Sequence, residues 1–147
     1  MLKDLTSEAL VRLNIEAKDW EDAIRQAADA LLQNGKIKPS YIDAIIKTVK
    51  ETGPYIVLTK HVALPHARSE AGAIESAIGI ATVKTPVVFG HKENDPVKYL
   101  FCLSAKDSES HINALADLTG LLDREDFYAM LDHAKDASEV IKYIQNL

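Results

Sequence analysis

Two unusually apolar segments lie in the middle of this chain, at residues 77–83 and 97–103. The first, AIGIATV, has no charged residue, and the second, VKYLFCL, has one. A strand that is apolar at nearly every position, rather than at alternate ones, is buried on both faces and covered by helices. We therefore expect both segments to be central strands of a sheet that lies between helical layers.

Two helices are predicted before these strands. Residues 20–32 carry apolar side chains at helical spacing, with Asp19 as the expected N-cap and Gly35 beyond the end. A second helix begins near Pro39, whose fixed φ suits a first turn, and stops at Gly53. Together they supply one covering layer.

Three further helices are predicted after the strands. Ser108 is expected to cap the first and Asp123 the second. Asp136 and Glu139, three residues apart, form the pattern of a capping box for the third. These helices supply the second covering layer.

Shorter apolar segments complete the expected sheet. Residues 55–58 and 62–64 are predicted as short strands and residues 87–89 as a separate short edge strand, whereas residues 9–13 fit either a helix end or an edge strand. Several connections are too short for crossover helices, which favours a mixed sheet. The fold class predicted is α/β, a three-layer α/β sandwich with a central mixed β-sheet flanked by helices, with residues 1–147 as a single domain.

Composition narrows the function classes. The net charge of −5 and the lack of a basic stripe argue against a nucleic-acid partner. Cys102 is the one cysteine, which excludes an internal disulfide, suits a reducing compartment and is expected to be a buried structural thiol. No apolar run is long enough for a membrane span, and the N-terminus has no apolar signal core. We expect a cytoplasmic protein without direct membrane insertion.

The segment from Val62 to Arg68, VALPHAR, is the strongest functional candidate. Proline lacks a backbone donor and ends regular structure, so His66 is expected at the end of a strand, beside the cation of Arg68. A histidine held in place there suits a nucleophile or a proton carrier. A surface histidine without a function is the alternative.

His111 is the expected partner of His66. It falls in the first turn of a predicted helix, where free N–H groups and a partial positive charge favour an anion such as phosphate and disfavour an imidazolium. Both histidines follow predicted strands, and sites in α/β sheets gather at the carboxyl ends of strands. If this helix begins far from His66, His111 is only a solvated first-turn residue.

A metal or cofactor is not expected. Of the five histidines, only His61 and His66 lie close in sequence, and their spacing places them on opposite faces of a strand. The chain also has no glycine-rich loop of the kind that holds nucleotide phosphates.

Residues 53–58, GPYIVL, followed by residues 62–68, VALPHAR, resemble the IIA component (EIIA) of the sugar phosphotransferase system, PTS. Within it, the chain is most similar to the ascorbate-type branch of the mannitol/fructose-type superfamily. Residues 20–23 (WEDA), residues 94–97 (NDPV) and the pair Ser110-His111 extend the resemblance over most of the chain.

The resemblance implies a phosphotransferase that acts as a phosphocarrier in sugar uptake, with ascorbate as the leading sugar. In this family His66 would take a phosphoryl group from phospho-HPr and pass it to a cysteine of the cognate EIIB, with the membrane component EIIC as an indirect partner. His111 would hydrogen-bond the phosphoryl group. Arg68 is the first candidate for the stabilising cation and Lys50, where mannitol-type relatives carry an arginine, the second.

The chain has Lys60-His61 where ascorbate-type relatives have proline-glycine, and Ser69 where they have proline. His61 either adds a charge at the site or points outward. A stand-alone regulatory module, which signals its phosphorylation state to a partner protein, is the alternative function, and a homodimer is also left open.

Overall fold

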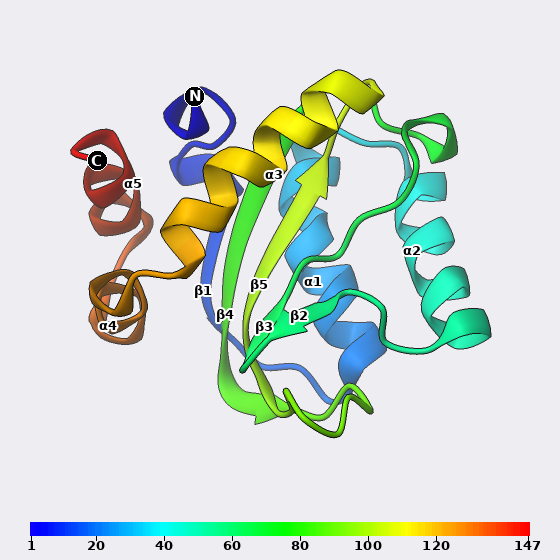
Figure 1. The fold of residues 1–147 in the computed structure, drawn as a ribbon, viewed down its shortest axis with the longest axis horizontal. Helices are drawn as coiled ribbons and strands as arrows, with labels where there is room; N and C mark the ends of the chain where they lie inside the picture. The colour runs from blue at the N-terminus through cyan, green and yellow to red at the C-terminus, as the bar shows by residue number, and fades with distance from the viewer.

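A five-stranded mixed sheet forms the middle layer of the computed structural model, which describes residues 1–147 (Figure 1). The strand order is β1-β4-β5-β3-β2, with β1/β4 and β3/β5 parallel and the other two pairs antiparallel. The strands are β1 (Val11–Ile15), β2 (Val57–Thr59), β3 (Val62–Ala63), β4 (Ala77–Val87) and β5 (Val97–Ser104). The prediction of central strands in a mixed sheet is confirmed.

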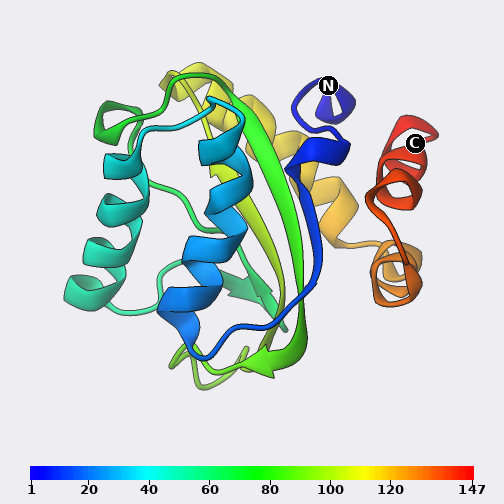
Figure 2. The ribbon, with the colours of Figure 1, turned by 180° about the vertical axis from the view of Figure 1, so that it is seen from behind.

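Helices cover both faces of the sheet (Figures 1 and 2). Helices α1 (Trp20–Gln33) and α2 (Pro39–Thr52) lie on one side, and α3 (Ser108–Leu122), α4 (Glu125–His133) and α5 (Ala137–Gln145) on the other. Short 3-10 turns span Leu2–Asp4, Glu8–Leu10 and Ser69–Ala71. Each side has its own buried apolar cluster, and β4 and β5 contribute side chains to both. That two-sided packing explains why these strands are apolar throughout.

Several predicted boundaries are confirmed by their local chemistry. The Asp19 carboxylate accepts a hydrogen bond from the Asp22 amide at 2.8 Å and caps α1. The capping box of Asp136 and Glu139 is present at the start of α5. The open choice for residues 9–13 resolves toward an edge strand, because β1 begins at Val11.

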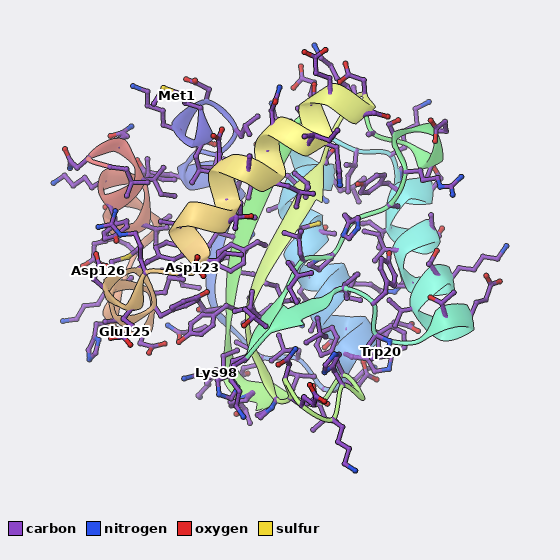
Figure 3. The ribbon with its side chains drawn as sticks, viewed as in Figure 1. Met1, Trp20, Lys98, Asp123, Glu125 and Asp126 are labelled. Atoms are coloured by element: carbon purple, nitrogen blue, oxygen red, sulfur yellow. The ribbon has the colours of Figure 1, made fainter.

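Two predicted helix caps are wrong. Asp107, rather than Ser108, caps α3: its backbone is extended and its carboxylate accepts from the Ser110 amide at 2.7 Å. Asp123 ends α3 instead of starting α4, because its backbone is already in the right-handed helical region (Figure 3). A cap residue needs an extended backbone to turn its side chain back toward the helix amides.

The separate strand predicted at residues 87–89 is also wrong. Strand β4 continues through Pro86 to Val87, which pairs with Val97 of β5 after an irregularity in the register. Residues 84–86 are exposed on this extension. Proline is tolerated there because the ladder is already interrupted.

Cys102 occupies the position expected of a structural thiol. It lies in β5, is fully buried, and burial raises the pKa of its thiol to about 12. A thiol held neutral in this way is a poor nucleophile. Among the helices, none combines the length and the apolar character needed to cross a membrane.

Candidate functional site

Strands β3 and β5 are parallel neighbours, so their carboxyl ends lie at the same edge of the sheet. His66 follows β3, and α3, which carries His111, follows β5. This edge is at the top of Figure 1, whereas Lys98, labelled in Figure 3 near the start of β5, lies at the opposite end. The two imidazole rings lie 5.5 Å apart between centroids, so the structure brings the two predicted histidines together.

One ring nitrogen of His66 is held by the backbone. Its Nδ1 lies 2.6 Å from the carbonyl oxygen of Leu64. A carbonyl oxygen only accepts, so Nδ1 must carry the proton and donate it. The lone pair of the neutral ring is therefore on Nε2.

A cavity of about 770 Å³ opens beside this ring. Its lining comes from α2, the turn before β2, the segment that follows β3, the connection from β5 to α3, and the start of α3. It comprises Ala44, Thr48, Tyr55, His66, Ala67, Arg68, Ser69, Glu70, Ala71, Ala105, Asp107, Ser108, His111 and Ile112. The rim includes apolar surface, since the Ile112 side chain is 64% exposed. The cavity thus combines two histidines, a helix N-terminus and an exposed apolar side chain at its rim.

His111 keeps a neutral side chain more readily than a free histidine. Burial, and then the nearby His66, lower the pKa of His111 below its ordinary value of 6.5. A neutral imidazole has one donor and one acceptor, which suits hydrogen bonding to a phosphoryl oxygen. The first amides of α3 add the partial positive charge of a helix N-terminus.

The two candidate cations are in different places. Arg68 is exposed and is the one lysine or arginine that lines the cavity. Lys50 is outside the lining, and its Nζ lies 3.0 Å from the Glu21 carboxylate. The hydrogen bond from Lys50 is also the main reason why the pKa of Glu21 is lowered. Arg68 is therefore the cation within reach of a group bound in the cavity.

The family model described as "Phosphoenolpyruvate-dependent sugar phosphotransferase system, EIIA 2" matches residues 4–147. The chain belongs to this family. As an EIIA component it has a phosphocarrier role in sugar uptake, and its family acts together with EIIB.

Individual relatives agree with this assignment. An ascorbate-specific PTS system EIIA component of Shigella boydii is 32% identical over 141 residues, which are 95% of this chain and 92% of the relative. The solution structure of the mannitol-specific cryptic phosphotransferase enzyme IIA CmtB from Escherichia coli is 34% identical, covers 99% of both chains and has a TM-score of 0.88. The complex of enzyme IIAMTL and phosphorylated enzyme IIBMTL from Escherichia coli is 26% identical, covers 97% of this chain and 98% of that chain, and has a TM-score of 0.83. The α/β fold with a mixed sheet is thus the mannitol-type EIIA fold.

His61 does not take part in this EIIA cavity. It precedes β3 rather than following it, and its Nδ1 donates to the Pro96 carbonyl at 2.6 Å. The choice left open by the sequence is therefore settled: His61 adds no charge beside His66. No three His, Cys, Asp or Glu side chains lie together in a way that would hold a metal ion.

Sequence reasoning missed two tyrosines at the site. Tyr55 was expected in a strand but lies in the turn before β2, with its ring edge-on to His66 at 5.4 Å between centroids. Tyr41 lies within the second predicted helix, and its hydroxyl reaches the Ala67 backbone. No pattern in the sequence marks them, because these contacts join residues that are 11 and 26 positions apart.

Proposed function

We propose that this EIIA component carries its phosphoryl group on Nε2 of His66. The observation that carries the proposal is the hydrogen bond between His66 Nδ1 and the Leu64 carbonyl, which is 2.6 Å long. The same imidazole ring lines the cavity. It leaves Nε2 as the nucleophilic nitrogen. Phosphoryl transfer needs alignment and charge stabilisation more than covalent help from other side chains, and the cavity offers both.

The donor is proposed to be the phosphohistidine of HPr. Nε2 of His66 attacks the phosphorus, an N–P bond forms to His66, and the N–P bond to HPr breaks with its electron pair returning to the HPr imidazole. In the second step a thiolate of EIIB attacks the same phosphorus. An S–P bond forms, the N–P bond breaks, and the electron pair returns to Nε2, while Nδ1 keeps its proton throughout.

His111 and Arg68 are proposed to stabilise the phosphoryl group during both steps. His111 donates a hydrogen bond to one oxygen as a neutral imidazole, in agreement with its lowered pKa. Arg68 offsets the negative charge that two carboxylates on the same lining, Glu70 and Asp107, add to that of the phosphoryl group. Donors already in place at the developing charge lower the barrier without reorganisation.

Ascorbate is the proposed sugar of the cognate transporter. The support is the 32% identity over 95% of the chain to an EIIA component that is named ascorbate-specific. A mannitol-specific relative is 34% identical, so the two sugars are to be compared directly. We propose to incubate the phosphorylated protein with the EIIB of an ascorbate transporter and with that of a mannitol transporter. Faster transfer to the former supports ascorbate, and equal or slower transfer argues against it.

Phosphorylation itself is tested by reconstitution. Wild-type protein, His66→Ala and His133→Ala are incubated with phosphoenolpyruvate, Enzyme I and HPr, and the intact mass is measured. His133 is exposed at the end of α4 and serves as the control histidine. One acid-labile phosphoryl group is expected on the wild type and on His133→Ala, and none on His66→Ala. An unchanged wild-type mass contradicts the proposal.

Onward transfer separates a carrier from a regulatory module. After excess donor is removed, EIIB is added and the phosphoryl group is followed to its cysteine. Transfer to EIIB supports the carrier role. A phosphoryl group that stays on His66 with every EIIB offered supports the regulatory alternative, in which a partner protein senses the phosphorylated state.

A further inference from the structure

The peptide bond that follows His66 is held at both of its polar ends. The Tyr55 hydroxyl donates to the His66 carbonyl oxygen at 2.6 Å. The Ala67 amide donates to the Tyr41 hydroxyl oxygen at 3.1 Å, and that hydroxyl donates its own proton to the Leu103 carbonyl at 2.7 Å. The carbonyl and the amide belong to one planar unit. Two phenols, from α2 and from the turn before β2, therefore fix a single rigid plane.

The backbone on the other side of His66 is fixed by main-chain contacts. The Leu103 amide donates to the Pro65 carbonyl at 2.9 Å, and the Leu64 amide donates to the Ile56 carbonyl at 2.7 Å. With both flanks held, the α-carbon of His66 has one position relative to Leu64. The Nδ1 hydrogen bond to the Leu64 carbonyl depends on that position.

We propose that Tyr41 and Tyr55 are positioning residues that form a clamp on the His66–Ala67 peptide and thereby keep Nε2 of His66 facing the cavity. This inference rests on the proposed role of His66 as phosphocarrier. Burial raises the pKa of both phenols, so both stay protonated as the contacts require. The Tyr55 ring adds an edge contact to the imidazole itself, with an interplanar angle of 73°.

The two members of the clamp differ in what else depends on them. Tyr41 is buried, and its removal leaves the Ala67 amide and the Leu103 carbonyl without a partner, which also destabilises the fold. Tyr55→Phe keeps the ring and removes only the hydroxyl. Because Tyr55 is 37% exposed, this change should disturb the fold less than the loss of Tyr41 does. Tyr55→Phe therefore carries the test.

A matched control exists at the far end of α3, away from the cavity. The Tyr128 hydroxyl donates to the Leu122 carbonyl at 2.6 Å, the same kind and length of contact, between α4 and the end of α3. Tyr128→Phe removes a comparable hydrogen bond away from the cavity. Any loss that comes only from reduced stability will appear in both variants.

The experiment has two readouts. The first is ¹⁵N NMR of the His66 ring in unphosphorylated protein, where the wild type and Tyr128→Phe are expected to show the Nδ1–H tautomer and Tyr55→Phe a mixture with Nε2–H. The second is phosphoryl uptake from phospho-HPr, where Tyr55→Phe is expected to lower kcat about three- to tenfold, as for one lost hydrogen bond, with KM for HPr unchanged.

Wild-type tautomer and wild-type kcat in Tyr55→Phe overturn the clamp. An equal change of tautomer or an equal loss of kcat in Tyr128→Phe also overturns it. If the wild type accepts no phosphoryl group at His66, the proposed function fails. The tautomer measurement needs no phosphate and still decides whether the Tyr55 hydroxyl orients the ring.

Discussion

The two ends of β3 each carry a histidine with the same local contact. His61 before the strand and His66 after it both donate from Nδ1 to a backbone carbonyl at 2.6 Å. Only His66 has a second histidine, an arginine and a helix N-terminus around it, in a cavity. The His61 backbone instead joins the turn between β2 and β3 to the start of β5, since its carbonyl accepts from the Lys98 and Tyr99 amides. A fixed tautomer leaves the lone pair on Nε2 in both histidines. Only the groups around His66 could also bind and stabilise a phosphoryl group.

Among the changes that test the difference between His66 and His61, the loss of His111 is expected to have the largest effect on phosphoryl transfer. We expect His111→Asn to accept phosphate at His66 but to lower the rate of transfer to EIIB by about 10²- to 10³-fold, as for one lost donor to a developing charge. His91→Asn, at the opposite end of the sheet, should transfer at the wild-type rate. Rapid-quench kinetics with phosphorylated protein measures both variants. A wild-type rate in His111→Asn would contradict its assigned role.

The next largest effect is expected from Arg68, which is compared with Lys50. Arg68→Gln is expected to slow phosphoryl uptake about tenfold, because an exposed charge-assisted contact is lost. Lys50→Gln should leave uptake unchanged, since Lys50 pairs with Glu21 outside the cavity. Initial rates with phospho-HPr at low salt compare the two. Slower uptake in Lys50→Gln than in Arg68→Gln would exchange their roles.

A change at the His61 end should affect stability alone, and only slightly. His61 has a φ of 67°, a left-handed conformation that favours glycine. His61→Gly removes the steric cost of the left-handed backbone but also removes the hydrogen bond to the Pro96 carbonyl. Because these two effects oppose each other, the free energy of unfolding should change by less than about 1 kcal/mol. Urea denaturation measures the change, and phosphoryl uptake should stay at the wild-type rate. Impaired uptake in this variant would remove the contrast between the two ends.

The pH dependence of stability should show the smallest effect. Because the pKa of folded His111 is lowered, the unfolded chain takes up a proton near the ordinary pKa of 6.5 that the folded protein resists. The contribution of His111 to stability is therefore present above that pH and falls as the pH drops through it. Solvent screening of this partly exposed group keeps the effect small. Urea denaturation of wild type and His111→Asn at about pH 7.5 and 5.5 should show a steeper fall for the wild type.

Much of the fold follows from local patterns in the sequence. The apolar residues of α1 and α2 repeat at helical spacing, and β4 and β5 are apolar on both faces, so each element and its burial can be predicted alone. The cap of α3 could not be predicted from the sequence, because Asp107 and Ser108 are both good cap residues and only the backbone angles decide between them. The end of β4 depends on its pairing with β5 past Pro86.

In the site, too, some features could be predicted from the sequence and others could not. His66 stands out because a proline precedes it, and His111 because it falls in the first turn of a helix after a strand. Their meeting follows from the parallel order of β3 and β5, which the sequence pattern does not encode. The clamp of Tyr41 and Tyr55 joins α2, a turn and the end of β5, so only the folded arrangement brings these groups together.

Whether Nε2 of His66 carries the phosphoryl group is decided by locating the phosphorus on the protein. Protein labelled with ¹⁵N-histidine is phosphorylated through HPr and examined by ¹⁵N and ³¹P NMR. A single phosphohistidine is expected, at His66, with phosphorus on Nε2 and the proton retained on Nδ1. Phosphorus on Nδ1 of His66, or on any other histidine, would contradict it.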